Sequence, residues 1–277
     1  MRTYAHDTAL PGGKYEEGDI DAEGTARREA YEEIGLPIDH EKVKKLCELE
    51  KFITGNSLIV TPVIFIITDH TLTPLLNPEE VKRLFSMPLN SFLFSRPSKI
   101  PSFHYNISHR ISSIPNWVID SIPPPPIVNY SLDKGQVGGK EGRFYGFRDI
   151  IWGNTLSSSN SSINNYLSFE NTELKDNESQ GQGKVRMHRF LTGREGQGVK
   201  PVYGLTAAIL IQTASIGYDQ FPDFPFHAPG QKSMTERILY EIRHVEGPLR
   251  RAVEVEGLWD DWKSEEGHDD QQKKAKL

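Results

Sequence analysis

The sequence predicts an α+β protein, because a few strand-like segments stand among helix-like segments and no internal repeat is visible. Residues 22–34 have the pattern of a helix. Residues 58–67 form a continuous apolar run rich in β-branched side chains, which is typical of a strand covered on both faces. Residues 186–191 favour another strand, and residues 204–211 favour a buried helix.

The helix over residues 22–34 carries signals at both ends. Asp21 has a side chain suited to an N-cap, and Gly35 can adopt the left-handed backbone that stops a helix. Pro37 then prevents the helix from continuing. In the strand-like run, Pro62 lacks an amide hydrogen and therefore implies an edge strand or a bulge. Residues 77–85 predict a turn that leads into a short helix.

Composition changes along the chain predict four segments. Residues 1–122 form the first part of a folded domain, and residues 185–263 complete it. The stretch 123–184 is rich in Pro, Gly, Ser and Asn, so we interpret it as an inserted loop that is largely disordered. Within it, residues 142–147 and 150–152 favour a strand or a docking patch. Residues 264–277 form a polar, charged tail.

The overall composition excludes several classes of protein. The chain has 277 residues and a formal net charge of −6, so nothing draws it in general toward nucleic acid. The longest apolar run, Val63–Ile67, is far too short to span a bilayer, and the first residues lack the apolar segment of a signal peptide. The single cysteine, Cys47, excludes an internal disulfide, and we interpret it as a small core residue rather than a catalytic one.

Three carboxylates share one face of the helix over residues 22–34. Glu29, Glu32 and Glu33 stand at i, i+3 and i+4, and an α-helix turns by about 100° per residue. An adjacent face that can pack on a sheet is lined by Ala26, Ala30 and Ile34. Like charges at this spacing repel each other, and hard divalent cations such as Mg²⁺ or Mn²⁺, which prefer oxygen ligands, would relieve the repulsion. The bland alternative is a solvated, charged helix face.

The residues before the helix fit the same chemistry. Gly12 and Gly13 allow backbone conformations closed to other residues and a close approach to a phosphate. Arg28 would most simply pair with Asp19 or Asp21 and fix the loop against the helix, which is a structural role.

Together these residues resemble the Nudix box, the signature of the Nudix hydrolase superfamily. The matching residues are Pro11–Lys14, Asp19 and residues 28–36, where the chain follows the pattern R-E-U-x-E-E-x-G-U with U apolar. The generic box has one residue fewer between its glycine and its arginine, so one residue is inserted here after Asp19. The resemblance implies the Nudix fold, a mixed β-sheet between α-helices.

The inserted residue is shared with the coenzyme A diphosphatase branch of the superfamily, whose box also reads P-G-G-K, an acid, and then T-A-x-R-E-x-x-E-E-I-G-L. Residues 25–29 supply the matching Thr-Ala-Arg-Arg-Glu run. The resemblance extends to residues 2–5, 77–81 and 202–207. Members of the family have a strand before the segment that matches Arg2, so we expect the fold to lack its first strand in this chain.

The resemblance implies metal-dependent hydrolysis of the diphosphate bond of coenzyme A or acyl-coenzyme A, giving 3′,5′-ADP and 4′-phosphopantetheine or its acyl form. Glu29 and Glu33 would ligate Mg²⁺ or Mn²⁺, and Glu32 would add a ligand or a hydrogen bond. The catalytic residues would be Glu33, Glu32 and Glu80, one of which would orient the attacking water. The expected substrate-binding residues are those of the glycine turn, Gly12, Gly13 and Lys14.

Other interpretations remain open at this point. Glu80 is the best candidate for a ligand or base outside the box, but it could equally be an acid favoured at the N-terminus of a helix. The same chemistry on ADP-ribose or NADH is the nearest rival, because the box specifies the reaction and not the leaving group. A non-catalytic domain that only binds ligand is the rival from another class. On the strand near residue 186 we expect solvent-facing side chains rather than phosphate ligands at Arg186, His188 and Arg189.

The chain ends in Ala275-Lys276-Leu277, a small-basic-Leu tripeptide of the S-K-L peroxisomal type. It stands on a polar tail, where a receptor could read it. The sequence therefore predicts a peroxisomal protein with the peroxisomal import receptor as a partner, and a cytoplasmic one as the alternative.

Overall fold

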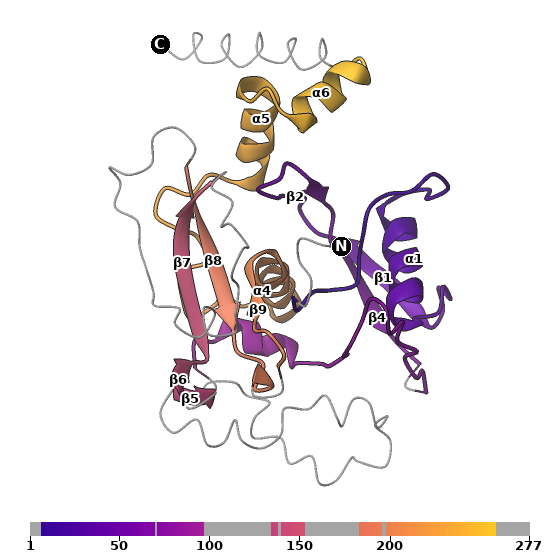
Figure 1. The fold of residues 1–277 in the computed structure, drawn as a ribbon, viewed down its shortest axis with the longest axis vertical. Coiled ribbons are helices and arrows are strands. Elements are labelled where there is room, and N and C mark those ends of the chain that lie inside the picture. The colour runs from indigo at the N-terminus through magenta and orange to yellow at the C-terminus, as the bar shows by residue number, and fades with distance from the viewer. Residues whose placement is uncertain are drawn as a thin grey trace. The chain divides into compact units, whose positions relative to one another are not determined.

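The computed structural model describes residues 7–69, 71–96, 134–137, 140–152, 183–195 and 198–258. The chain divides into two compact units, of which the larger comprises residues 1–50 and 61–231 and the smaller residues 51–60 and 232–277. The predicted α+β class is confirmed. The elements, labelled in Figure 1, are α1 (Ala22–Ile34), β1 (Val43–Glu48), β2 (Phe52–Ile53), β3 (Ile59–Val60), β4 (Val63–Ile67), the 3-10 helix η1 (Leu89–Leu93), β5 (Lys134–Val137), β6 (Lys140–Arg143), β7 (Tyr145–Ile151), β8 (Lys184–Phe190), β9 (Val202–Tyr203), α4 (Gly204–Tyr218), α5 (Met234–His244) and α6 (Pro248–Val255).

The larger unit contains a three-stranded antiparallel sheet in the order β7-β8-β9. Strands β7 and β8 run side by side in Figure 1, with Tyr145 opposite Phe190 and Ile151 opposite Lys184. The strand predicted near residues 186–191 and the helix predicted at residues 204–211 are both confirmed, as β8 and α4. Strand β7 falls on the residues singled out within the stretch 123–184.

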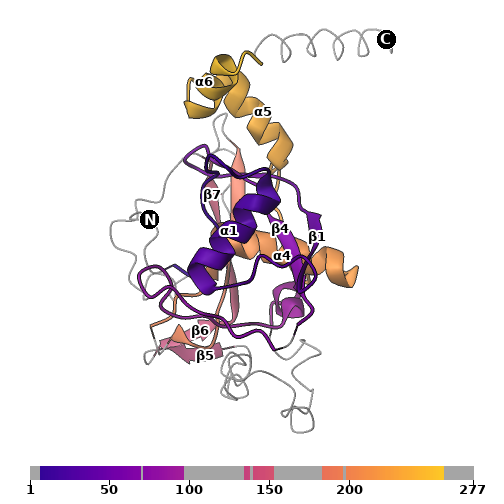
Figure 2. The ribbon, with the colours of Figure 1, turned by 90° about the vertical axis from the view of Figure 1, so that its right-hand side faces the viewer.

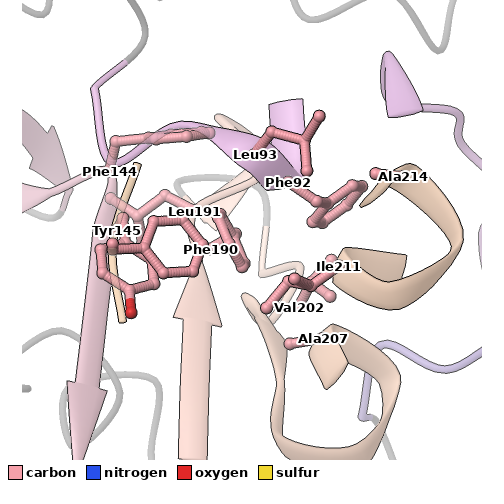
Figure 3. Packing of buried hydrophobic residues seen from close by; sticks show 11 residues of the cluster. Phe92, Leu93, Phe144, Tyr145, Phe190, Leu191, Val202, Ala207, Ile211 and Ala214 are labelled. Atoms are coloured by element: carbon pink, nitrogen blue, oxygen red, sulfur yellow. The ribbon is translucent and has the colours of Figure 1, made fainter. Parts of the chain in front are cut away.

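The core of this unit forms where α4 and η1 pack against β8 (Figure 3). Phe190 lies at its centre, with ring centroids 5.0 Å from Phe92 of η1 and 5.2 Å from Tyr145 of β7. Edge and tilted contacts of this kind stabilise aromatic pairs beyond the burial of their surface. Helix α4 contributes small and branched side chains, and the cluster comprises Phe92, Leu93, Phe144, Tyr145, Phe190, Leu191, Val202, Ala207, Ile211, Ala214 and Phe224.

Strands β1 and β4 form an antiparallel pair, and β4 contacts helix α1. The predicted strand at residues 58–67 is interrupted at Pro62, as its missing amide hydrogen requires, and yields the separate strands β3 and β4. The expectation that this strand is covered on both faces is wrong, because Ile66 and Ile67 are 46% and 39% exposed. Cys47 is also exposed rather than in the core, and it lies beside a bulge in β1.

Residues 77–85 form the predicted turn, but the predicted helix after it is absent from this described stretch. The amides of Glu80 and Val81 both donate to the carbonyl of Asn77, at 3.1 and 2.8 Å. The Asn77 side chain accepts the amide of Glu79 at 3.2 Å, so the turn is stabilised locally and does not propagate.

The smaller unit pairs β2 with β3 and adds α5 and α6. Helix α5 begins with a capping box, in which Ser233 and Glu236 each bond the other's backbone amide. Helix α6 has Pro248 in its first turn, where no amide hydrogen is needed. None of the helices in the described residues is long and apolar enough to cross a membrane.

Strand β8 carries a buried polar network instead of the predicted solvent-facing side chains, so that expectation is wrong. Arg186, His188 and Arg189 are 4%, 1% and 0% exposed. The guanidinium of Arg186 binds both carboxylate oxygens of Asp149 on β7, at 2.8 and 2.9 Å, and stacks 3.9 Å from the ring of Phe147. A buried charge is tolerated here because it is paired and hydrogen-bonded.

The imidazole of His188 is held in its neutral form. Its Nε2 donates to the carbonyl of Phe226 at 2.9 Å, so its Nδ1 accepts the hydroxyl of Tyr145 at 3.0 Å. Burial is the main cause that lowers the pKa of His188 from 6.5 to about 4.

We predict that this histidine makes the protein sensitive to mild acid. Because the pKa is lower in the folded state, the unfolded state takes up the proton first, and stability is lost as pH falls from 6.5 toward 4. The free energy of unfolding should fall by about 2 kcal/mol from this residue between pH 7.5 and pH 5. Urea unfolding at both pH values measures this.

His188→Gln should be less stable than the parent at pH 7.5 but should lose less stability on acidification. His40, whose side chain is 69% exposed, supplies the matched control, and His40→Gln should keep the parental pH dependence. An unchanged acid sensitivity in His188→Gln would contradict the assignment.

Candidate functional site

Helix α1 is fixed at both ends by the residues expected from the sequence. Asp21 accepts the amide of Gly24 at 2.8 Å as the N-cap. Gly35 has φ of 67° and donates its amide to carbonyls of the last turn. A Cβ at Gly35 would lie 2.8 Å from the Cβ of Leu75, so only glycine fits this end of the helix.

One face of α1 packs on β4, and both Figure 1 and Figure 2 show the helix beside the strands β1 and β4. Ala30 is buried on this face, as expected. Sequence reasoning missed Arg27, which is 5% exposed, pairs with Glu23 at 2.8 Å and lies 4.6 Å from the ring of Phe65. A neighbouring acid four residues earlier is the signal that could have placed this arginine on the packed face.

Arg28 ties the loop before the helix to the carboxylate face. Its Nε and Nη2 donate to the two carboxylate oxygens of Asp19, each at 3.0 Å, and its Nη2 also donates to the carbonyl of Lys14 at 2.9 Å. The predicted pairing of Arg28 with Asp19 is confirmed. The bidentate bond to the arginine holds the pKa of Asp19 far below its ordinary range.

The same guanidinium reaches two of the predicted metal ligands. Its Nη1 donates to Glu29 at 3.1 Å and to Glu32 at 3.2 Å. The side chain of Glu29 is 15% exposed and that of Glu32 is 51% exposed. Arg28 therefore offsets part of the negative charge that the helix gathers.

The glycine turn contacts the glutamates directly. The backbone amide of Gly12 lowers the pKa of the Glu33 carboxyl, against the effects of burial and neighbouring charge. Gly13 lies against the carboxylate of Glu29, and a Cβ at this position would collide with it. A side chain at Gly13 would therefore have to displace the Glu29 carboxylate, while Lys14 is exposed and contributes its carbonyl to Arg28.

Glu80 is brought to the helix by a chain segment that returns to its C-terminal end. The amide of Leu75 donates to the carbonyl of Ile34, and the amide of Asn77 donates to the carbonyl of Glu33, both at 2.9 Å. The side-chain amide of Asn77 also donates to Glu80 at 3.4 Å. Sequence reasoning missed this role of Asn77, because only the folded chain shows which carbonyl its amide meets.

Glu33 is the electrostatic centre of this site. Its pKa is raised from 4.5 to about 7, first by burial and then by the negative charges of Glu29, Glu80 and Glu32. The negative charges of Glu29, Glu32 and Glu80 thus act on the carboxyl group of Glu33. Such an arrangement is costly in a metal-free protein and is characteristic of functional sites.

The chemistry of the candidate ligands fits a hard divalent cation, because all of the side-chain ligands are carboxylate oxygens. The accumulated negative charge raises the pKa of Glu33, and bound positive charge would reverse that shift. Among the residues that the structure describes, no three Asp, Glu, His or Cys side chains are already gathered in an arrangement that could hold a metal ion. Arg28 bonds Glu29 and Glu32 instead.

Comparisons with known proteins show which proteins this chain is similar to. Residues 2–111 match the family model described as the NUDIX domain. Over 94 residues the chain is 45% identical to the mitochondrial Nudix hydrolase 15 of Arabidopsis thaliana, covering 34% of this chain and 32% of that protein. Over 87 residues it is 38% identical to a peroxisomal coenzyme A diphosphatase of Mus musculus, covering 31% of this chain and 36% of that protein.

A peroxisomal coenzyme A diphosphatase of Saccharomyces cerevisiae is 31% identical over 118 residues, covering 34% of this chain and 35% of that protein. The chain thus spans about a third of the length of each of these three curated relatives.

The raised pKa of Glu33 predicts that this residue destabilises the metal-free protein. A carboxyl with a higher pKa in the folded state loses stability as pH rises from 4.5 through 7. Glu33→Gln, which is neutral at every pH, should therefore be more stable than the parent at pH 8, by roughly 1 kcal/mol after allowance for solvent screening.

Thermal unfolding in the presence of a chelator, at pH 8 and again at pH 4.5, measures the difference. The advantage of Glu33→Gln should vanish at the lower pH, where the parent carboxyl is also neutral. Equal stabilities at pH 8 would show that the carboxylates do not act on Glu33.

Proposed function

Because this chain contains a Nudix domain, matched over residues 2–111, we propose that it hydrolyses the diphosphate bond of coenzyme A or acyl-coenzyme A. The products would be 3′,5′-ADP and 4′-phosphopantetheine or its acyl form. The observation that carries the proposal is the face of α1 that bears Glu29, Glu32 and Glu33, with the turn of Glu80 tied to it by the bond from the Asn77 amide to the Glu33 carbonyl. A cluster of this kind suits the binding of cations beside a diphosphate.

The metal would be Mg²⁺ or Mn²⁺, held by Glu29, Glu33 and Glu32. When bound, such an ion neutralises phosphate oxygens and lowers the pKa of a bound water. Arg28 would remain paired with Asp19, because that pair fixes the loop carrying Lys14. Gly12, Gly13 and Lys14 are proposed to meet the substrate, since the turn lies directly against the carboxylates of Glu33 and Glu29.

One of the carboxylates of this chain would accept the proton of the attacking water. Attack of water on phosphorus forms one P–O bond and breaks the P–O bond to the leaving phosphate, and the water proton must pass to a base. Glu33, Glu32 and Glu80 are the candidates. Glu80 is exposed and reaches the site from a separate turn, so it can meet a water that the helix carboxylates do not enclose.

The choice of coenzyme A rests on the similarity to the mouse and yeast proteins, both described as peroxisomal coenzyme A diphosphatases. The mitochondrial and chloroplastic Nudix hydrolases, at 45% and 42% identity, carry names that specify no substrate, so a second candidate stays open. That candidate is the same reaction on another nucleoside diphosphate, such as ADP-ribose or NADH. A domain that only binds ligand is the third candidate, and it predicts no turnover.

We predict that Glu33→Gln lowers the rate of coenzyme A hydrolysis by at least about a hundredfold, because it removes a charge and a metal-binding oxygen while keeping the side chain's size. Chromatographic measurement of 3′,5′-ADP release with Mg²⁺ or Mn²⁺ tests this. Glu79→Gln, in the same exposed turn as Glu80, is the matched control and should retain the parental rate.

If Glu33→Gln hydrolyses coenzyme A at the parental rate, the assignment of Glu33 to the catalytic site is wrong. Release of products from ADP-ribose or NADH but not from coenzyme A would instead favour the second candidate. Binding of coenzyme A without any turnover would favour the third.

We also propose a peroxisomal location through the import receptor, with the cytoplasm as the alternative. Ala275-Lys276-Leu277 lies outside the described residues, and its small-basic-Leu pattern supports this proposal. Two relatives are named as peroxisomal, whereas two others are named as mitochondrial and chloroplastic.

We predict that Leu277→Asp moves a fusion with an N-terminal fluorescent protein from puncta to the cytosol, because the tripeptide is an address read by a receptor. Microscopy with a peroxisomal marker measures the change. Lys274→Ala, just outside the tripeptide, should leave the puncta in place. Puncta that persist with Leu277→Asp would refute the targeting role.

A further inference from the structure

Two separate arms of the chain reach the carboxylate site around Glu33, and both contact the same distant segment. The glycine arm (residues 7–13) lies against the Glu29 carboxylate through Gly13. The acidic arm (residues 77–85) carries Glu80 and donates the amide of Asn77 to the carbonyl of Glu33 at 2.9 Å. The distant segment runs between β8 and β9, and we call its described part, residues 191–195 and 198–201, the connector.

The connector is stabilised by its own hydrogen bonds. The amide and hydroxyl of Thr192 both donate to Glu195, at 2.5 and 2.9 Å. The backbone amide of Arg194 donates to the hydroxyl of Thr192 at 3.1 Å, and its guanidinium donates to the carbonyl of Thr192 at 2.9 Å. All three residues are no more than 5% exposed. Buried and mutually bonded groups of this kind hold one conformation.

The glycine arm is attached at the C-terminal end of the connector. The ammonium of Lys200 binds the carboxylate of Asp7 at 2.6 Å, and the Lys200 side chain is only 11% exposed. The hydroxyl of Thr8 donates to the carbonyl of Lys200 at 2.5 Å, and Thr8 forms a parallel bridge with Val202. These bonds fix the chain four residues before Gly12.

The acidic arm is attached at the other end. The guanidinium of Arg194 lies 4.8 Å from the centroid of the Phe85 ring, which is a cation–π contact. Phe85 stands five residues after Glu80 in the same arm. Because Arg194 is buried and already bonded to the connector backbone, this contact restrains the position of the arm.

We propose that the connector sets the placement of both arms on Glu33, and that Lys200 and Arg194 are positioning residues for the carboxylate site. Neither residue needs to touch the substrate. The proposal rests on the proposed function, since it assigns these residues to the site that would bind the diphosphate. Small displacements of a site's supporting residues lower turnover more than they lower substrate affinity.

The test removes each attachment with minimal loss of packing. Lys200→Met and Asp7→Asn break the ion pair from its two ends, and Phe85→Leu removes the cation–π contact while keeping an apolar side chain. Each should lower kcat of the full chain by about fivefold with little change in KM, and Lys200→Arg should restore most of it. Lys44→Met is the matched control, because Lys44 makes a surface ion pair with Glu41 at 3.5 Å.

A second readout is independent of activity. Amide hydrogen exchange of Gly12 should become faster by at least about fivefold in Lys200→Met and Asp7→Asn, while exchange in α4 stays parental. Parental kcat and parental Gly12 exchange in these variants would overturn the proposal, as would failure of Lys200→Arg to restore either. If the parent hydrolyses no diphosphate, the proposed function fails, and the Gly12 exchange still decides whether the connector places the arm.

Discussion

Electrostatic repulsion among the carboxylates around Glu33 is the constraint that the surrounding structure offsets. Like charges at helical spacing cost a few tenths of a kcal/mol per pair even when exposed, and burial increases the cost. Arg28 neutralises part of this charge and is itself fixed by the bidentate bond to Asp19. The amide of Gly12 stabilises the ionised form of Glu33. Each of these contacts offsets part of the repulsion, and a bound cation would offset the remainder.

The parts of the site that the sequence predicted are those decided by short-range chemistry. Asp21 caps the start of the helix with its side chain, and Gly35 ends the helix through its left-handed backbone. Arg28 meets Asp19, which stands only nine residues earlier in the chain. The site's fourth carboxylate was identified only by resemblance. Its placement depends on the amide of Asn77 meeting the carbonyl of Glu33, a contact between segments far apart in sequence that no local pattern encodes.

The errors on the strands have a related cause. Polar residues on β8 were expected to face solvent, because charged side chains are seldom buried. Asp149 lies on another strand, and only the pairing of β7 with β8 brings it to Arg186 and makes burial tolerable. For β4, apolar side chains were expected to be buried and are instead partly exposed. A continuous apolar run was expected to be covered on both faces, yet Ile66 remains 46% exposed.

The pairing of β7 with β8 also brings together the two ends of the chain segment that connects these strands. Ile151 lies directly opposite Lys184, and the amide of Trp152 donates to the carbonyl of Gly183 at 3.0 Å. The described residues on either side of this connection are therefore adjacent in the sheet. Doubling the length of such a connection costs only about 0.6 kcal/mol in closure entropy. A change in the length of this connection therefore alters the closure entropy only slightly while its two ends stay in place.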